Sequence, residues 1–531
     1  MGRLKVAEPA LAIRDLSVVL HREGRGVRIL DRVSLEAVPG EIVALVGESG
    51  SGKSTLGLAV QGLLPAESRP VVTGSIRVAG VELVGAAARQ LRAARRSLVR
   101  AVPQDPMAGL NPTMTIRRQL AGSTRDATAI RHWLARAGLA DPDRIAAAYP
   151  HCLSGGQRQR VLIAMAMMAR PKLIIADEPT TALDVTTQAH ILEWLRELAR
   201  QQQTAILFIT HDLGVAASLA DRMVVLEEGR VVETGPTRAI LDRPTHAGTR
   251  ALLASRFDLK SDRSRPVPVG SALKAWPVCA AVEAATALRL SGVHKSYASG
   301  ARTPWGRRPQ PVLSAIDLTI RRGECLALVG ESGAGKSTIL RIAAGLVAPD
   351  RGEVVRADLR PQMVFQDPAS ALTPWLTIGE QIGERLRGSG LAAAERDRKV
   401  EEALGLAGLD PALARALPAE LSLGQCQRAA IARAIIVPPK LLLCDEPVCS
   451  MDVPLAATIL NLLGALRRRL GMAMLFATHD LAAARLVADR IAVLRHGRLV
   501  EQGDPDALIA APATEYTRAL IAAVPKLENC Q

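Results

Sequence analysis

The sequence predicts an α/β protein that carries the same domain twice, one copy in each half of the 531-residue chain. Two observations lead to this prediction. Short apolar runs alternate with helical stretches, which is the pattern of parallel strands covered by helices. The two halves also repeat one ordered set of short motifs, which indicates an internal duplication. Because ligands bind at the carboxyl ends of parallel strands, each copy is expected to hold a site of its own there.

Three pairs of short apolar runs are interpreted as buried parallel strands, because each run is continuous and is bounded by charged or turn residues. In a first pair a glycine-rich turn and a helical stretch follow the run, and in a second pair the run ends in a carboxylate. The three pairs are E-I-V-A-L-V-G (41–47) with E-C-L-A-L-V-G (324–330), L-I-I-A-D (173–177) with L-L-L-C-D (441–445), and A-I-L-F-I-T-H (205–211) with A-M-L-F-A-T-H (473–479).

A polar stretch that contains proline separates the two copies. It reads S-D-R-S-R-P-V-P-V-G-S at 261–271, which is the composition of a linker rather than of a packed element. The sequence therefore predicts a first domain at 1–257, a linker at 258–283 and a second domain at 284–531.

A phosphate loop is predicted directly after the first strand of each half. G-E-S-G-S-G-K-S-T at 47–55 and G-E-S-G-A-G-K-S-T at 330–338 both fit the pattern G-x-x-x-x-G-K-S. Glycines let the backbone turn its N–H groups toward phosphate oxygens, and the following helix presents its positive end to the same phosphates. Lys53 and Lys336 are expected to neutralise the β- and γ-phosphates of ATP. The expected ATP-binding residues of the two loops are Gly47, Ser49, Gly50, Gly52, Lys53, Ser54, Thr55, Gly330, Ser332, Gly333, Gly335, Lys336, Ser337 and Thr338.

An acidic pair ends the second strand of each half, within a repeated D-E-P motif. Asp177 and Asp445 stand where a carboxylate can hold hydrated Mg²⁺. Successive residues of a strand point to opposite sides, so Glu178 and Glu446 can address an attacking water instead of the metal. The magnesium ligands expected from the loops and the acidic pairs are Ser54, Asp177, Ser337 and Asp445.

The pentapeptide L-S-G-G-Q at 153–157 narrows the class of phosphate-loop protein. A phosphate loop alone would suit a kinase or a GTPase, but this pentapeptide shortly before D-E-P resembles the signature of the ATP-binding-cassette (ABC) family. L-S-L-G-Q at 421–425 repeats it in the second half. The resemblance implies two tandem nucleotide-binding domains, each with a mainly parallel sheet core, an antiparallel β subdomain and a helical signature subdomain.

The ABC resemblance also implies roles for single residues. The two domains would pair head to tail, so that each ATP lies between one domain's phosphate loop and the other domain's signature. His211 and His479 would contact the γ-phosphate, and Gln104 and Gln366 would contact both ATP and magnesium. The implied catalytic residues are Glu178, Glu446, His211 and His479. The signature residues expected at ATP are Ser154, Gly155, Gly156, Gln157, Ser422, Gly424 and Gln425. The loop that crosses the domain seam would contain Asp184 and Asp452.

Longer stretches resemble the importers of oligopeptides, dipeptides and nickel within this family. They include V-P-Q-D-P-M-A-G-L-N-P-T-M-T-I at 102–116 and the tails T-R-A-L-L-A-S at 249–255 and Y-T-R-A-L-I-A-A-V-P at 516–525. This resemblance implies an ATPase subunit that energises a binding-protein-dependent importer, peripheral to the cytoplasmic face of the membrane. Its implied cofactors are ATP and Mg²⁺. Its implied partners are two transmembrane permease subunits and, through them, an extracytoplasmic solute-binding protein.

The two predicted sites are not equivalent. In the second signature Leu423 replaces a glycine whose small size lets the backbone approach the γ-phosphate. Val448–Met451 occupy the positions of Thr180–Leu183 in the first half. The second half has Tyr297 where the adenine ring stacks, whereas the first half has Leu20. Head-to-tail pairing gives the intact signature and the tyrosine to the second phosphate loop, which is expected to dominate hydrolysis. The alternative is that the altered site tolerates Leu423 with little effect.

The formal net charge of +15 leaves a second class of function open. It reflects either compositional bias or attraction to an anionic surface, such as a nucleic acid or a membrane leaflet. The main alternative is therefore a soluble tandem ABC ATPase that acts on ribosomes or nucleic acid, with an exporter subunit as a third. The short linker argues against translation-type members, so no nucleic acid partner is expected.

Further composition supports a cytosolic or membrane-peripheral protein. No run reaches the about 18 apolar residues of a membrane helix, and the N-terminus does not read as a signal peptide. The seven cysteines form no C-x-x-C pair, so the sequence predicts no zinc or iron–sulfur site.

Overall fold

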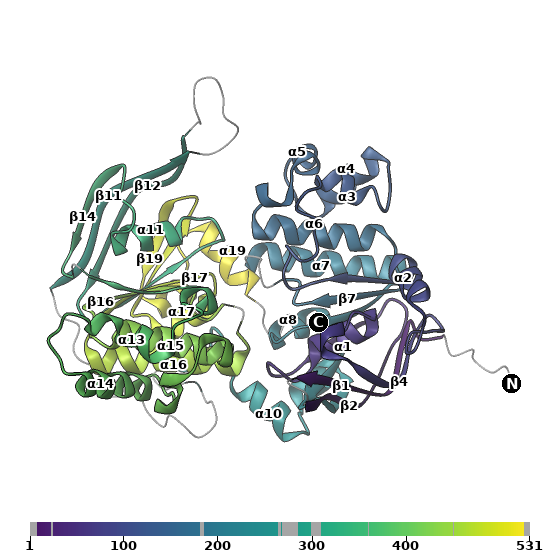
Figure 1. Ribbon diagram of the computed structural model, residues 1–531. Helices are drawn as coiled ribbons and strands as arrows, with labels where there is room; N and C mark the ends of the chain where they lie inside the picture. Colours follow the sequence, from purple (N-terminus) through teal and green to yellow (C-terminus); the bar gives the residue numbers. More distant parts are fainter. Residues whose placement is uncertain are drawn as a thin grey trace. The chain divides into compact units, whose positions relative to one another are not determined.

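The structure, a computed structural model, describes residues 8–22, 25–180, 185–263, 267, 285–298, 309–358, 360–449 and 451–524. These residues form two compact units, which divide between Ala254 and Ser255. We call them the first unit and the second unit, and Figure 1 shows both. The division lies just before the predicted linker at 258–283. Most of that linker lies outside the described residues.

The first unit contains two sheets. A four-stranded antiparallel sheet has the order β2-β1-β4-β5, and a six-stranded sheet has the order β10-β9-β3-β8-β7-β6, in which only β10 runs antiparallel. The strands are β1 (Leu11–Arg22), β2 (Arg25–Ala37), β3 (Ile42–Val46), β4 (Val71–Val78), β5 (Val81–Glu82), β6 (Val99–Val102), β7 (Leu173–Asp177), β8 (Ala205–Ile209), β9 (Arg222–Glu227) and β10 (Arg230–Pro236).

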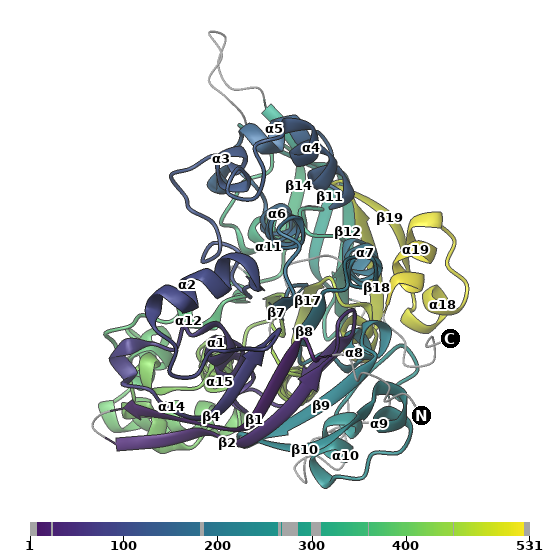
Figure 2. The same ribbon diagram turned by 90° about the vertical axis from the view of Figure 1, so that its right-hand side faces the viewer.

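The helices of the first unit cover the six-stranded sheet and build a separate helical part. Helices α3, α4 and α5 lie at the end of the unit opposite to the antiparallel sheet, in both Figure 1 and Figure 2. The helices are α1 (Lys53–Gln61), α2 (Ala88–Ser97), α3 (Ile116–Leu120), α4 (Ala127–Arg136), α5 (Pro142–Ala147), α6 (Gly155–Met168), α7 (Val185–Gln202), α8 (Leu213–Leu219), α9 (Thr237–Asp242) and α10 (Ala247–Ala254), with the short 3₁₀ turns η1 (Ala66–Ser68) and η2 (Pro150–Cys152).

The second unit repeats this plan. Its antiparallel sheet has the order β12-β11-β14, and its six-stranded sheet has the order β15-β16-β17-β13-β18-β19, in which only β19 runs antiparallel. The strands are β11 (Thr286–Ala298), β12 (Pro309–Arg321), β13 (Cys325–Val329), β14 (Arg351–Arg356), β15 (Gln362–Val364), β16 (Leu441–Asp445), β17 (Ala473–Thr478), β18 (Arg490–Arg495) and β19 (Arg498–Gly503).

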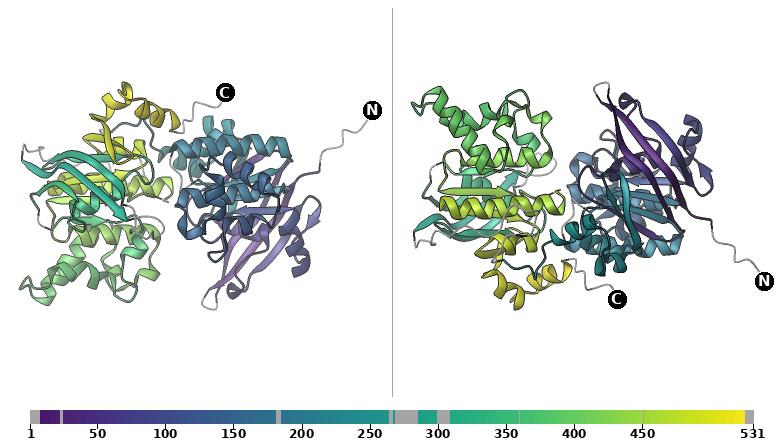
Figure 3. Two further views of the ribbon diagram at one scale, coloured as in Figure 1. Left: turned by 90° about the horizontal axis from the view of Figure 1, so that it is seen from above. Right: turned by 90° about the horizontal axis from the view of Figure 1, so that it is seen from below.

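The helices of the second unit pack at both edges of its six-stranded sheet. Helix α15 contacts β15 at one edge and α18 contacts β18 and β19 at the other. In both views of Figure 3 the green helices and the yellow C-terminal helices of this unit lie at opposite ends of it. The helices are α11 (Lys336–Ala344), α12 (Pro368–Ala371), α13 (Ile378–Gly383), α14 (Ala393–Leu406), α15 (Leu423–Ile435), α16 (Val453–Leu470), α17 (Leu481–Val487), α18 (Pro505–Ala510) and α19 (Glu515–Ala523), with the 3₁₀ turns η3 (Glu384–Leu386), η4 (Pro411–Arg415) and η5 (Pro418–Glu420).

The predicted fold class is confirmed, and the sequence runs that predicted it form the centre of each sheet. The six runs correspond to β3, β7 and β8 in the first unit and to β13, β16 and β17 in the second. All five residues of β3 and of β13 are buried, because helices or the antiparallel sheet cover both faces of the strand. Burial on both faces explains why these runs are continuously apolar rather than alternating.

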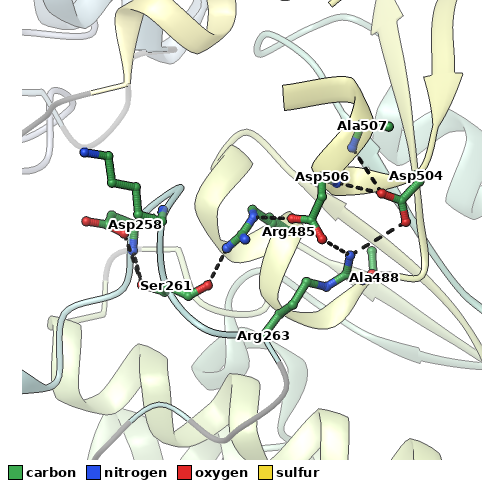
Figure 4. A network of polar contacts seen from close by, with 9 residues as sticks. Asp258, Ser261, Arg263, Arg485, Ala488, Asp504, Asp506 and Ala507 are labelled. Carbon is green, nitrogen blue, oxygen red and sulfur yellow. Dashed lines mark hydrogen bonds and ion pairs between the residues drawn. The ribbon is translucent and has the colours of Figure 1, made fainter. Parts of the chain in front are cut away.

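The start of the predicted linker is held on the second unit by charged side chains (Figure 4). Arg263 Nη1 donates to Asp506 Oδ2 at 3.0 Å, and Arg485 Nε donates to Asp506 Oδ1 at 2.8 Å. The same two arginines also donate to main-chain carbonyl oxygens, Arg485 to Ser261 and Arg263 to Ala488. The Asp506 carboxylate on α18 therefore connects Arg263, at the start of the predicted linker, to Arg485 on α17.

A buried amide anchors the chain a few residues further on. Asn461, on α16, is 2 % exposed. Its Oδ1 accepts from the main-chain N–H of Val267 at 2.9 Å, and its Nδ2 donates to the carbonyl oxygen of Val267, also at 2.9 Å. The Val267 side chain is buried in the apolar cluster of the second unit. A pair of hydrogen bonds thus continues the chain attachment that Arg263 begins.

We predict that Asn461→Ala lowers the free energy of unfolding of the second unit by about 1–3 kcal/mol, because both main-chain groups of Val267 lose their buried partners. The measurement is denaturant unfolding of the full chain, together with limited proteolysis around residue 267. Gln310→Ala changes an exposed polar residue of the same unit and should shift stability by less than about 0.5 kcal/mol. Equal unfolding curves for the two variants would contradict the anchoring role of Asn461.

Candidate nucleotide-binding sites

Each predicted phosphate loop packs so closely against a neighbouring strand that its first residue must be glycine. A Cβ atom on Gly47 would lie 2.1 Å from the carbonyl oxygen of Leu226 at the end of β9. A Cβ atom on Gly330 would lie 2.2 Å from the carbonyl oxygen of Leu494 on β18. Real Cβ atoms do not approach carbonyl oxygens this closely, so any larger residue would push the loop off the sheet. This contact sets how closely each loop packs against the neighbouring strand.

The opposite side of each loop is open. Gly50 and Gly333 have φ of 83° and 82°, and a Cβ atom on either would meet nothing within 4 Å. A left-handed backbone with free space above it can turn N–H groups toward a bound anion. The other predicted loop residues lie in the same turn or in the first helical turn after it, namely Ser49, Thr55, Ser332 and Thr338.

The lysine of each loop is buried and folds back over the loop. Lys53 Nζ donates to the carbonyl oxygens of Gly47 and Glu48 at 2.8 and 2.7 Å. Lys336 makes the same two contacts with its own loop at 2.8 and 3.1 Å. Both lysines begin a helix after a glycine with left-handed backbone, φ 102° and 109°. A buried ammonium group and a helix N-terminus together favour a phosphate group at this position.

A hydroxyl and a buried carboxylate lie beside each lysine. In the second unit Ser337 Oγ donates to Asp445 Oδ1 at 3.0 Å. Burial raises the pKa of Asp445, although the hydrogen bond from Ser337 opposes the shift. Asp177 shows the same raised pKa from burial, opposed by its hydrogen bond from Ser54. A buried carboxylate with a raised pKa is stabilised by a nearby cation, and these hard oxygen donors are of the kind that Mg²⁺ prefers. The residues present therefore fit a magnesium ion.

The glutamate after each of these carboxylates has an unusual backbone. Glu178 and Glu446 both have φ 46°, in the left-handed region that L-residues rarely adopt. The next strand holds this turn in place: the N–H of Glu178 donates to the carbonyl oxygen of Ile209, and the N–H of Glu446 to that of Ala477, both at 2.9 Å. Strain of about 1–3 kcal/mol of this kind clusters at functional sites. Here it turns the glutamate side chain away from its neighbouring aspartate and toward a histidine.

In the first unit, three predicted site residues meet at one carboxylate. His211 Nδ1 lies 2.8 Å from Glu178 Oε1, and Gln104 Nε2 donates to Glu178 Oε2 at 2.9 Å. Glu178 follows β7, His211 lies in the turn after β8, and Gln104 lies in the segment after β6. Strands β8, β7 and β6 are neighbours in the six-stranded sheet. The carboxyl ends of these strands thus bring together side chains that are far apart in the sequence.

The second unit builds the same cluster with a different sharing of oxygens. His479 Nδ1 lies 3.2 Å from Glu446 Oε2, and Gln366 Nε2 lies 3.4 Å from the same oxygen. The other oxygen, Oε1, lies 3.3 Å from Lys336 Nζ. The phosphate-loop lysine of the second unit is therefore paired with the glutamate that was predicted to activate water.

Charge pairing sets the protonation of this second cluster. Burial alone would raise the pKa of Glu446, but the hydrogen bond and charge of His479 and the charge of Lys336 lower it to about 2. Burial would lower the pKa of His479, but Glu446 raises it above its ordinary value. The glutamate is therefore ionised and paired with Lys336 and His479, which makes it a weak base.

We predict that His479 titrates at a higher pH than an ordinary histidine, and that Glu446→Gln lowers its pKa below the ordinary value. The carboxylate that favours the charged imidazole is then gone, whereas burial, which disfavours it, remains. The measurement is the pH titration of labelled histidine ring signals by NMR. Glu178→Gln is the matched control and should leave the His479 titration unchanged. An unchanged His479 titration in Glu446→Gln would contradict the pairing.

Both signature segments begin a helix with the same reciprocal cap. The Ser154 hydroxyl oxygen accepts from the N–H of Gln157 at 3.2 Å, and the Gln157 side chain accepts from the N–H of Ser154 at 3.0 Å. Ser422 and Gln425 repeat the pair at 3.3 and 2.8 Å. The signature thus has a local structural role as a capping box at the N-terminus of α6 and of α15.

Leu423 does not disturb this cap. It occupies the first turn of α15, where it is 43 % exposed, whereas the next residue, Gly424, would clash with Leu455 if it carried a Cβ. In this unit a Cβ on Gly424 would force the Leu455 side chain to shift, whereas the Leu423 side chain is accommodated at the surface of the helix. Any effect of Leu423 must fall on a group that approaches α15 from outside.

The two residues at the positions expected to stack on adenine, Tyr297 and Leu20, also differ in exposure. Tyr297 on β11 is 37 % exposed, with the Lys295 ammonium group 5.7 Å from the centre of its ring. Leu20 on β1 is 7 % exposed and belongs to the core of the first unit. An accessible aromatic face is thus present at this position in the second unit and is replaced by a core residue in the first.

One side chain near the second site was not predicted as functional. Cys449 Sγ lies 3.8 Å from Gln366 Nε2, beside Glu446. The only sequence signal was its position directly after D-E-P-V, where the first half has a threonine. Asp184 and the rest of 181–184, together with Ser450, lie outside the described residues.

Comparison with known proteins identifies the family. The model of the ABC transporter family matches residues 30–181 and 313–449. The model of the oligopeptide/dipeptide transporter C-terminal region matches residues 232–273 and 500–531. The chain belongs to the ABC transporter family, and within it to the group that carries this C-terminal region. It is an ATPase of that family, and the predicted resemblance is confirmed.

Two relatives match over nearly the whole chain. The peptidoglycan transport ATP-binding protein YejF of Agrobacterium fabrum is 40% identical, over 98% of this chain and 97% of that protein. The glutathione import ATP-binding protein GsiA of Salmonella choleraesuis is 38% identical, over 97% of this chain and 89% of that protein. Among solved structures, the archaeal ribosome recycling factor aABCE1, in complex with a ribosomal stalk protein, matches with a TM-score of 0.60 and 20% identity, over 92% of this chain and 90% of that one. This last likeness shows the fold alone.

Proposed function

We propose that this chain is the ATP-hydrolysing subunit that energises a binding-protein-dependent importer of peptides. The observation that carries the proposal is the presence of two phosphate-loop sites in one chain, each followed by a match to the oligopeptide/dipeptide transporter region. The names of the two relatives, which refer to peptidoglycan transport and glutathione import, also favour peptide-containing cargo over nickel, the other cargo expected from the sequence.

Among the described residues, no helix is long and apolar enough to cross a membrane. The proposal therefore assigns passage of the solute to two separate permease subunits, on which this chain docks at the cytoplasmic face. A solute-binding protein outside that membrane would deliver the peptide. Which peptides are carried would be set by the binding protein and the permease.

In the proposed reaction, each phosphate loop holds the β- and γ-phosphates of ATP and the buried lysine neutralises them. In the second unit, Ser337, Asp445 and Gln366 would hold magnesium, with Ser54, Asp177 and Gln104 in the first. The ion, when bound, supplies positive charge to the phosphate oxygens. Glu446 would accept a proton from the attacking water, and His479 would orient that water against the γ-phosphate.

The pairing of Lys336 with Glu446 gives the second site a resting state. Lys336 Nζ lies 3.3 Å from Glu446 Oε1, so a γ-phosphate that draws the ammonium group toward itself would release this oxygen. The pKa of Glu446 would then rise from about 2, because one of the charges that lower it has moved away. Binding of ATP would thus free Glu446 to act as the general base in ATP hydrolysis.

We further propose that the two sites contribute unequally. If the units pair head to tail, the site of Lys336 receives the intact signature from the first half and has Tyr297 for the adenine ring. The site of Lys53 receives the signature with Leu423, whose exposed side chain would stand between the helix end and the γ-phosphate. We therefore assign most of the turnover to the second site.

Steady-state ATPase of Glu178→Gln and Glu446→Gln, each in complex with the permease, tests the inequality. Glu446→Gln should lower turnover by about two orders of magnitude, which is the usual contribution of a general base. Glu178→Gln should keep most of the wild-type rate. If Glu178→Gln is the more damaging variant, the assignment of the dominant site is wrong.

Action on ribosomes or nucleic acid, the alternative that the charge of +15 left open, has no support from a specific observation at either site. Co-purification separates the two functions. The proposal expects the chain to be recovered with membrane permease subunits, and recovery with ribosomes instead would overturn it.

A further inference from the structure

The second unit brings together three side chains that are common ligands of zinc. Glu446 offers a carboxylate, Cys449 a thiol and His479 an imidazole, and one ligand atom of each lies within 4.8 Å of the other two. We propose that these residues form a binding site for a thiophilic divalent cation of the zinc type. We further propose that the ion blocks hydrolysis at the second site.

The donor set suits zinc better than magnesium. Zinc binds thiolate, imidazole and carboxylate ligands at about 2.0–2.3 Å in a tetrahedron, so its ligand atoms stand roughly 3.4–3.7 Å apart. The His479 Nδ1 to Glu446 Oε2 distance is already 3.2 Å. All three ligand atoms lie within 4.8 Å of one another, which exceeds the tetrahedral spacing by about 1 Å at most. Three protein ligands leave a fourth position for water, as in zinc sites that are open to solvent.

Of the two carboxylate oxygens of Glu446, Oε2 is the one that faces the other members of the cluster rather than Lys336. Lys336 lies near Glu446 Oε1, whereas Oε2 faces His479 Nδ1 and Gln366 Nε2. The Gln366 amide nitrogen lies between the carboxylate and the thiol, 3.4 Å from Oε2 and 3.8 Å from Cys449 Sγ. A cation at this point would take the place of an amide N–H group that is held only by long contacts. The positive charge of Lys336 opposes binding and so limits the affinity.

Only the second half has a thiol at the position of Cys449. The first half has Thr181 at the position of Cys449, and its Glu178 and His211 are held at 2.8 Å without a thiol in the aligned sequence. A threonine hydroxyl is a poor ligand for a thiophilic cation. The chain therefore provides a natural replacement for Cys449, with which the site can be removed.

Binding would remove the groups that the reaction needs. When the cation binds, the Cys449 thiol loses its proton to solvent, and so does His479 Nδ1, which must give up the proton that it shares with Glu446. Glu446 and His479 would then be held as ligands and could neither accept a proton from water nor orient it. The binding itself rests on the geometry of the cluster, whereas the inhibition also rests on the hydrolytic role proposed for Glu446.

Cobalt(II) binding to the purified full chain tests the site directly, because a cobalt–thiolate bond gives a charge-transfer band in the near ultraviolet. We expect the wild-type chain to show this band and Cys449→Thr to lose it. Cys152→Ser, which removes an exposed thiol of the first unit, is the matched control and should keep it. A band that persists in Cys449→Thr, or no band in the wild-type chain, overturns the proposed site.

Zinc inhibition of ATPase activity, measured in complex with the permease and normalised to each variant's zinc-free rate, tests the consequence. Cys449→Thr should raise the zinc concentration for half-inhibition at least about tenfold, as loss of a group that supports a metal site does. Cys152→Ser should respond like the wild type. Equal zinc sensitivity of wild type and Cys449→Thr overturns the inhibition. If the cobalt band still depends on Cys449 in that case, the failure lies with the base assigned to Glu446 and not with the metal site.

Discussion

The packing of each phosphate loop against the neighbouring strand is the constraint on which both sites depend. Because a Cβ on Gly47 or Gly330 would lie within 2.2 Å of a strand carbonyl oxygen, only glycine lets the loop pack in this position. That position places the lysine at the start of the following helix and directs its ammonium group back over the loop. It also brings the lysine of the second unit within 3.3 Å of Glu446. In the proposed reaction, binding of phosphate and activation of water are therefore coupled through the side chain of Lys336.

Much of the fold could be predicted from the sequence, because its strongest signals are local. Runs such as E-I-V-A-L-V-G mark central parallel strands that are buried on both faces, and the glycine-rich motifs mark the turns that follow them. The meeting of Gln104, Glu178 and His211 could be expected only from the family resemblance, since it depends on strand order. The left-handed backbone of Glu178 and Glu446 could not be predicted, because no glycine or asparagine marks it. The strain is imposed by the hydrogen bond to the next strand.

The signature of the second unit differs from that of the first without a change in local structure. A leucine in place of a signature glycine was expected to affect the approach to the γ-phosphate, and it leaves the helix end intact: Ser422 and Gln425 form the same cap as their counterparts in the first unit. Leu423 is accommodated because its side chain is exposed, whereas a side chain at Gly424 would force Leu455 to shift. Cys449 is a second position at which the two halves differ, and it lies beside Glu446.

The central claim, that turnover belongs mainly to the site that receives the intact signature, is tested most directly by exchanging the two signature residues. ATPase activity would be measured for Gly155→Leu and for Leu423→Gly, each in complex with the permease. The account predicts that Gly155→Leu removes most of the activity, whereas Leu423→Gly keeps or raises it. Nearly full activity in Gly155→Leu would contradict the account, because a leucine would then be harmless at the site that should depend on glycine.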